Sequence, residues 1–274
     1  MTKGRFKCAA VALFGSLIAA SAQAHDPIFG LGPHVLYQGG VEVATKLHDG
    51  KQGSEHETEF ELELTYGITG DWSAGVELPY ARKRGIGTSA SGVADVSAFT
   101  KYRFWRRDSL GLQESAAVML IVKMPTGSTS TSPALGSGAT DIMAGVAYGY
   151  ESRKWYRFAS LRYRQNGRNS AGLKRGDKIL VDIVGGIRTK LTGYREPDTV
   201  WMLELNGEFG QRADNNGTPV TNTGGSEWFL SPGIFWTKRN FAVKAGVQIP
   251  IYSALNGTQA KSDYRAKAIL EWHL

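Results

Sequence analysis

The sequence predicts an all-β protein: a transmembrane, up-and-down antiparallel β-barrel of about twelve strands, of the bacterial outer-membrane type. Three observations predict this fold. Segments that alternate polar and apolar residues recur along the chain, an export signal precedes them, and short connections alternate with long ones. Alternation sends polar and apolar side chains to opposite faces of a strand, as a wall between lipid and a wet lumen requires.

Residues 1–24 have the organisation of a secretory signal peptide. Basic residues precede the apolar run 8–20, and a small-x-small cleavage site ends at Ala24. The run is shorter than the roughly 20 apolar residues of a spanning helix. We therefore expect export and a mature chain that begins at His25. The only cysteine, Cys8, leaves with the signal, so the mature chain has no disulfide.

The segment after the signal, residues 25–38, is rich in Gly and Pro and has no strand periodicity. We expect it to be irregular and to lie in the periplasm or within the lumen. The barrel then occupies residues 39–274. Its expected strands cover residues 41–48, 57–68, 72–80, 94–104, 113–124, 141–150, 155–165, 178–191, 200–211, 226–236, 241–252 and 264–274.

The second strand shows the alternation most clearly. Apolar residues such as Phe60 and Leu64 occupy one parity, and four glutamates occupy the other. Successive side chains of a strand point to opposite faces, so this strand has one wet and one apolar face. The glutamates are Glu57, Glu59, Glu61 and Glu63.

The connections support a membrane barrel over a soluble β-sandwich. Short connections follow the second, fourth, sixth, eighth and tenth strands, and longer ones follow the odd strands, which matches short periplasmic turns and long external loops. The last strand alternates up to Trp272 and Leu274, similar to the terminal signature that barrel-assembly machinery recognises. Aromatic residues near many strand ends are typical of interfacial girdles.

The polar parity is expected to line the lumen, because a charge facing lipid costs about 2–4 kcal/mol at the bilayer midplane. Two interpretations remain open: mixed-sign ladders that pair and fill a narrow barrel, and a charged channel wall. Barrel closure places the first, second and last strands side by side, with the glutamates beside Lys46 and near Arg265 and Lys267. The candidate lumen residues are Lys46, Glu57, Glu59, Glu61, Glu63, Lys101, Arg103, Arg162, Arg164, Glu204, Glu208, Lys244, Arg265 and Lys267.

Other function classes find little support. The net charge of +7 includes the signal-peptide cations, and no polybasic run with interleaved aromatics suggests nucleic-acid binding. No histidine is expected in mid-strand beside a positioned serine, so we expect no enzyme and no cofactor. A metal site is an alternative: His25, as a free amino terminus, and His34 are candidate ligands, because imidazole suits copper and zinc.

Four stretches resemble one known family: 25–30 after the signal, 63–69 with the following Trp72, 133–141, and 235–246. They resemble the bacterial outer-membrane, transporter-like barrel family labelled "putative MetA-pathway of phenol degradation". Pro133 to Asp141 is the most specific of these motifs. The resemblance implies an outer-membrane barrel that moves small solutes, aromatic or hydrophobic compounds among them, and it carries over no catalytic residue.

The sequence thus favours an exported outer-membrane channel or transporter for passive passage of small solutes in a Gram-negative bacterium. Its expected partners are outer-membrane lipid and lipopolysaccharide, the barrel-assembly machinery and a small-molecule solute. Two alternatives stay open. One is a non-conducting structural or adhesive barrel, and the other is a metal-associated protein that uses His25.

Overall fold

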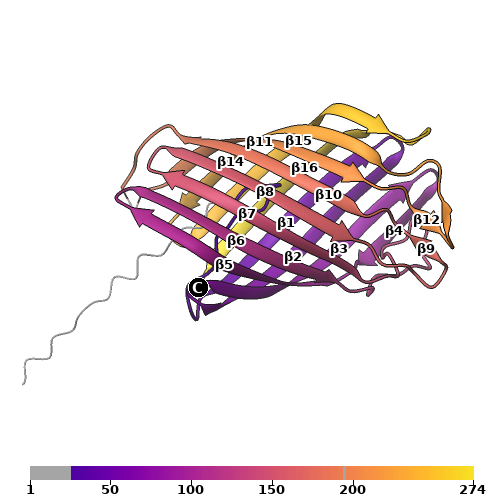
Figure 1. Ribbon diagram of the computed structural model, residues 1–274, viewed down its shortest axis with the longest axis horizontal. Helices are drawn as coiled ribbons and strands as arrows, with labels where there is room; N and C mark the ends of the chain where they lie inside the picture. The colour runs from indigo at the N-terminus through magenta and orange to yellow at the C-terminus, as the bar shows by residue number, and fades with distance from the viewer. Residues whose placement is uncertain (1–25, 194–195) are drawn as a thin grey trace, which may run out of the picture.

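The computed structural model describes residues 26–193 and 196–274, whose long strands close into one antiparallel barrel (Figure 1). Each of the twelve long strands in this part of the chain pairs with two neighbours, and β1 pairs with β16 to complete the ring. The ring, in order, consists of β1 (Val41–Gln52), β2 (Glu55–Thr69), β3 (Trp72–Gly85), β5 (Ser97–Ser109), β6 (Leu112–Lys123), β7 (Asp141–Ser152), β8 (Trp155–Gln165), β10 (Lys178–Arg188), β11 (Asp198–Gly210), β14 (Gly225–Lys238), β15 (Phe241–Leu255) and β16 (Ser262–His273).

Four short strands lie outside the ring in segments that the sequence analysis assigned to loops. β4 (Thr88–Val93) extends the sheet along the end of β3, and β9 (Leu173–Lys174), β12 (Asp214–Asn215) and β13 (Thr218–Pro219) form a small separate sheet. β4 is rich in Ser, Thr and Gly, and the other three strands have two residues each, so periodicity could not reveal them.

Most strand boundaries agree with the predicted ranges, but two connections differ. β1 and β2 continue past the expected loop 49–56 and meet in a two-residue turn at 53–54, where Gly53 has a positive φ. His48 and His56 therefore lie on strands. The residues 106–109, expected as a turn, belong to β5, because Gly111 at φ 71° supplies the left-handed position that the following turn needs.

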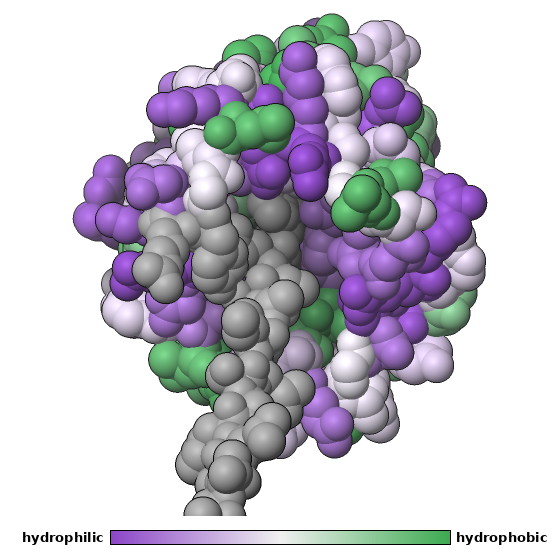
Figure 2. All heavy atoms as spheres, turned by 90° about the vertical axis from the view of Figure 1, so that its left-hand side faces the viewer, coloured by the Kyte–Doolittle hydropathy of each residue, from purple (hydrophilic) through white to green (hydrophobic). Residues whose placement is uncertain are grey.

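The two ends of the barrel differ. We call the end with the connections 70–71, 110–111, 153–154 and 239–240 the turn end, and the opposite end the loop end. Strand β1 begins and β16 finishes at the turn end, since β1 runs antiparallel to both of its neighbours. Figure 2 shows the turn end, where hydrophilic side chains gather around the rim.

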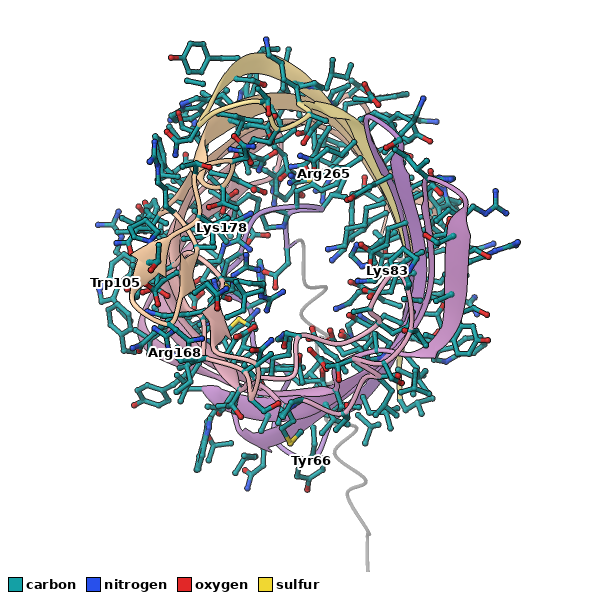
Figure 3. All side chains as sticks on the ribbon, turned by 90° about the vertical axis from the view of Figure 1, so that its right-hand side faces the viewer. Tyr66, Lys83, Trp105, Arg168, Lys178 and Arg265 are labelled. Atoms are coloured by element: carbon teal, nitrogen blue, oxygen red, sulfur yellow. The ribbon has the colours of Figure 1, made fainter. Side chains whose placement is uncertain are left out.

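The strand faces separate as the sequence predicts. Looking in from the loop end, Tyr66 and Trp105 point away from the barrel, whereas Lys83, Lys178 and Arg265 point into it (Figure 3). Many large apolar and aromatic side chains are exposed on the outer surface. At the turn end Phe241 contacts both Trp236 and Trp272 edge to face, in the arrangement of an interfacial aromatic girdle. No helix in the described ranges is long and apolar enough to span a bilayer.

Residues 26–40, which we call the N-terminal segment, run into the lumen, where Ile28 and Phe29 join the apolar core of the barrel. Ile28 is 1% exposed and packs with inward-facing residues of five strands. Two glycines of the barrel wall make room for the segment. A Cβ at Gly233 would overlap Ile28, and a Cβ at Gly67 would overlap the Tyr37 carbonyl. The inner-wall residues of this cluster are Tyr156, Phe158, Val184, Val200, Met202, Phe235 and Ala242.

The outward position of Ile183, in the middle of β10, allows a direct test of the lipid-facing assignment. We expect Ile183→Arg to destabilise the barrel by about 2–4 kcal/mol, the usual penalty for a cation at mid-bilayer. Denaturant unfolding in lipid vesicles measures this change. Leu110→Arg is the control, because Leu110 is 98% exposed in a turn and should shift stability by less than about 0.5 kcal/mol. Equal effects of the two substitutions would contradict the assignment.

Candidate functional site

The glutamate row of β2 (Glu57, Glu59, Glu61 and Glu63) faces the lumen and is mostly paired. The Lys46 ammonium lies 2.6 Å from Glu61 and 3.2 Å from Glu77 of β3, and it also contacts Glu63. Register explains this cluster, because Lys46 lies directly opposite Glu61 and Glu63 lies opposite Glu77. Here the structure favours the interpretation of paired ladders.

Two glutamates of the row lie outside the Lys46 cluster. Glu57 pairs with Lys83 at 3.0 Å, near the loop end. Glu59 lies opposite His48 across the β1–β2 ladder. Among the described residues, Glu59 forms no hydrogen bond or ion pair.

Arg265 and Lys267 of β16 do not pair with the glutamate row as the sequence suggested. Arg265 contacts Glu208 of β11 and lies over the Phe229 ring, 4.5 Å from its centroid. Its neighbour across the β1–β16 ladder is Gly50, which offers no side chain, and the guanidinium instead extends past β15 toward β14 and β11. Lys267, opposite His48, forms no ion pair within the described part of the chain.

The remaining candidates have separate roles. Arg103 donates to Asp71 and to the Gly70 carbonyl and so fixes the turn at 70–71. Lys244 pairs with Glu271 at 2.6 Å. Arg164 faces Lys178 across the β8–β10 ladder and forms no ion pair with a described residue.

The N-terminal segment is held chiefly by Glu204, which is 0% exposed. Its carboxylate accepts hydrogen bonds from the backbone N–H groups of Ile28 (2.6 Å), Phe29 (3.2 Å) and Gly30 (3.0 Å). Three successive backbone N–H groups form a concave anion-binding site, and here the anion is the Glu204 carboxylate of β11. A chain stretch without periodicity thus occupies a specific position in the lumen.

A network around Asp182 surrounds this anchor. Asp182 of β10 accepts from Ser160 (2.6 Å), Arg162 (2.7 Å) and Asn206 (2.8 Å). Arg162 also donates to the carbonyl of Phe29 in the N-terminal segment. Asp182 is not among the residues predicted to line the lumen, although its position on the polar parity of β10, between the outward residues Val181 and Ile183, indicates an inward side chain.

The first residues of the segment add a charged cluster at the turn end. Lys101 of β5 pairs with Asp26 at 2.8 Å, and His34 contacts both Asp26 (2.7 Å) and Glu151 (2.5 Å). Both ring nitrogens of His34 are therefore engaged, and the residue serves as an ion-pairing group of the segment, so it has no nitrogen free for a metal. His25, the other candidate ligand, lies outside the described residues.

The charges of this cluster stabilise the ionised forms of His34 and Asp26. Burial by itself lowers the pKa of His34, but Glu151 and Asp26 outweigh it and raise the pKa from 6.5 to about 9. Burial raises the pKa of Asp26, and Lys101 and His34 outweigh that effect, so this pKa lies well below its usual range. Both residues lie outside the membrane-spanning strands.

Two cavities lie next to the glutamate row in the described part of the lumen. The inner cavity, of about 310 Å³, lies beside the N-terminal segment, and the outer cavity, of about 490 Å³, lies toward the loop end. Glu61 lines both. The inner cavity has an apolar wall that includes Phe99, Met119, Ile121 and Met143, and a charged wall that includes Lys46, Glu63, Glu77 and Lys267.

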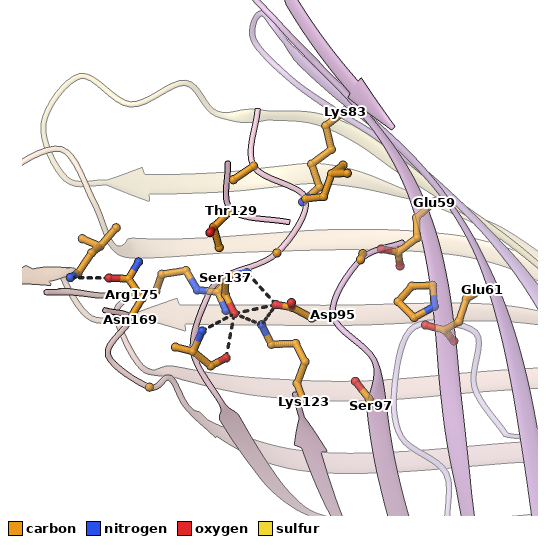
Figure 4. Close-up of a pocket in the computed structure, with 18 residues that line it drawn as sticks. Glu59, Glu61, Lys83, Asp95, Ser97, Lys123, Thr129, Ser137, Asn169 and Arg175 are labelled. Atoms are coloured by element: carbon orange, nitrogen blue, oxygen red, sulfur yellow. Dashed lines mark hydrogen bonds and ion pairs between the residues drawn. The ribbon is translucent and has the colours of Figure 1, made fainter. Parts of the chain in front are cut away.

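The outer cavity is shaped by the loop 124–140, which folds inward. Asp95 fixes this loop by accepting from Ser137 N (2.8 Å), Gly127 N (3.0 Å) and the Lys123 ammonium (2.8 Å). Figure 4 shows the contacts of Asp95 with Ser137 and Lys123, with Glu59 and Glu61 further to the right on the wall. Leu135 of the loop packs with Ala81 and Ala94. The motif 133–141 therefore builds part of the lumen's outer boundary.

Known proteins share this architecture. The crystal structure of the COG4313 outer membrane channel from Pseudomonas putida F1 matches with a TM-score of 0.71 at 13% identity, covering 88% of this chain and 98% of that one. The NanC porin matches with a TM-score of 0.51 at 11% identity, covering 85% of this chain and 100% of that one. At such identities the likeness shows a shared fold of the outer-membrane barrel type. No curated protein matches the chain.

The family model described as "Putative MetA-pathway of phenol degradation" matches residues 79–254, from β3 to the loop-end part of β15. The match includes the inward loop 124–140, the Asp182 network and Glu204. This chain belongs to that family.

Proposed function

We propose that this protein is a passive, non-enzymatic channel in the outer membrane of a Gram-negative bacterium, and that it admits small amphipathic solutes, including aromatic compounds. The observation that carries the proposal is the pair of lumen cavities, inner and outer, which share Glu61 as a lining residue. One cavity lies toward the loop end, and the other lies beside the N-terminal segment. The channel and porin of similar fold support the same proposal.

The solute class follows from the two unlike walls of the inner cavity. Phe99, Met119, Ile121 and Met143 offer apolar contact, while the opposite wall offers ammonium and carboxylate groups. A solute with a ring or short alkyl body and one polar or ionised group satisfies both walls. A sugar would leave the apolar wall without a matching surface.

The N-terminal segment favours a second candidate, a barrel that does not conduct at rest. It lies in the lumen, anchored by Glu204, and leaves an inner cavity of only about 310 Å³. In the channel proposal, passage requires the segment to shift. If weakening the contacts of the segment leaves the conductance unchanged, the barrel has a structural role and is not a channel.

The surroundings of the barrel follow from its outer surface. We propose that the exposed apolar belt contacts outer-membrane lipid and lipopolysaccharide, with the turn end in the periplasm and the loop end outside, after removal of the signal peptide. The alternating last strand would be the segment engaged by barrel-assembly machinery.

Liposome swelling tests the function directly. Proteoliposomes are placed in isotonic benzylamine, benzoate, glucose or a trisaccharide, and the swelling rates are compared with those of protein-free vesicles. We expect the aromatic ions to enter faster than glucose and the trisaccharide not to enter. Rates equal to those of empty vesicles for every solute would exclude a channel.

Glu204→Gln should raise conductance, because an amide accepts the three N–H groups poorly. Hydrogen bonds to a charged group contribute about 1.5–3 kcal/mol each, so loss of one should increase the displaced fraction of the segment at least about tenfold. Single-channel recording in planar bilayers measures this fraction as open time. Glu208→Gln is the matched control: it removes a charge four residues further along β11 on the same face, where the partners are Lys178 and Arg265 rather than the segment. Equal open times for the two variants would contradict the anchoring role.

Conductance should also rise at alkaline pH. The pKa of His34 is raised from 6.5 to about 9 in the folded protein, so its contribution to docking is complete below pH 6.5 and is lost as pH rises through about 9. Open time should therefore increase between pH 8 and pH 10, values that bracket this pKa. His34→Gln should be more open at pH 7 and should lose this pH dependence; a wild-type response that persists in the variant would show that another group titrates.

A further inference from the structure

Three clusters of metal-binding side chains lie within the described residues, and they differ in whether a cation already occupies them. Glu61, Glu63 and Glu77 surround the Lys46 ammonium. In a second cluster, Glu42, Glu271 and His273, the Lys244 ammonium pairs with Glu271. In the third cluster, His48, Glu59 and Glu61, the Lys46 ammonium pairs with Glu61, but Glu59 has no ion-pair partner in the described part of the chain.

We propose that His48, Glu59 and Glu61 form a binding site for a divalent transition-metal ion at the junction of the two lumen cavities. One donor atom from each residue lies within 4.8 Å of the others. Zinc–nitrogen and zinc–carboxylate bonds are about 2.0–2.2 Å long, so small rotations of the two flexible glutamate side chains bring the donors into range. Water completes the coordination from the cavity side.

The strand geometry places the three ligands in one cluster. His48 lies directly opposite Glu59 in the β1–β2 ladder, and Glu61 follows Glu59 on the same face of β2. Glu61 contacts Lys46 through Oε1 and keeps Oε2 for a second cation. Three lumen-facing positions on two paired strands therefore supply one imidazole and two carboxylates.

An unpartnered atom provides independent support. The Nε2 atom of His48 is inaccessible to solvent and has no hydrogen-bond partner among the described residues. A buried polar atom without a partner costs free energy, and native structures rarely keep one without a reason. Imidazole is mostly neutral above its usual pKa of about 6.5, and a neutral ring offers a lone pair to zinc or copper.

The local charge also favours a divalent cation. Glu61, Glu63 and Glu77 share the single ammonium group of Lys46, and Glu59 lies beside Glu61 without an ion-pair partner in the described residues. Lys46 remains bound to Glu63 and Glu77 when Glu61 is shared with a metal. Carboxylates placed side by side on one strand repel each other, and a bound dication removes that repulsion.

The site borders three cavities. Glu59 and Glu61 line the outer cavity, His48 and Glu61 line the inner cavity, and His48 and Glu59 line a third space between β1, β2 and β16. Ions can therefore reach it from the loop end while the N-terminal segment stays docked. Binding does not depend on conduction, so a failed swelling assay and a failed metal titration remain separate results.

Titration calorimetry of the untagged, chelator-treated protein in detergent with Zn²⁺ tests the proposal. We expect a site that is weakened in both His48→Gln and Glu59→Gln. Loss of even an outer-shell partner reduces metal affinity about 10–100-fold, so loss of a direct ligand should reduce it at least about tenfold. Heat-dependent gel mobility confirms that each variant is folded, and the second variant preserves the test if the first fails to fold.

His273→Gln is the matched control, since His273 belongs to a different cluster near the turn end. This variant should bind Zn²⁺ with wild-type affinity and stoichiometry. Wild-type affinity in Glu59→Gln, or loss of binding in His273→Gln, would overturn the proposal. Mg²⁺ in place of Zn²⁺ should bind far more weakly, because Mg²⁺ prefers all-oxygen octahedral sites, and equal affinity for the two ions would exclude an imidazole ligand.

Discussion

The contact between the Glu204 carboxylate and three backbone N–H groups is the interaction on which the lumen's structure depends. A fully buried carboxylate is strongly destabilising unless hydrogen bonds compensate for the lost water. The backbone of the N-terminal segment has the same need, because its N–H groups would otherwise be orphaned inside the barrel. Each therefore requires the other, and their contact fixes where Ile28 packs and how much of the lumen stays open.

Most other lumen charges follow a similar rule of pairing. Lys46, Arg162, Lys244 and Arg265 each contact a carboxylate on another strand or across the barrel. Period-two alternation forces these residues inward, since the lipid face excludes them. Pairing then keeps the narrow interior from accumulating like charges. Glu59 and Lys267 lack such partners in the described residues, and both lie beside His48.

The sequence allowed the barrel to be predicted far better than its contents. The strand predicted over 155–165 has the same bounds as β8. The turn expected at 106–109 lies instead at 110–111, only a few residues further along the chain. These features depend on local periodicity and turn chemistry, which a single sequence carries. The docking of residues 26–40 depends instead on long-range matches, such as Gly233 beside Ile28, that leave no periodic signal. Arg265 was misplaced for a related reason: the small residue opposite it mattered more than strand adjacency.

The wall of the barrel is consequently divided between two tasks. Strands β8, β10, β11 and β14 use their inward residues, from Ser160 to Ser231, to hold the segment and the network around Asp182. A side chain committed to a buried network cannot also adapt to passing solutes without breaking it. The charged residues of β1, β2 and β3 instead line both cavities around Glu61. Recognition of a solute's ionised group should therefore depend mainly on these strands and on Lys267, whereas Phe99, Met119 and Met143 contact its apolar body.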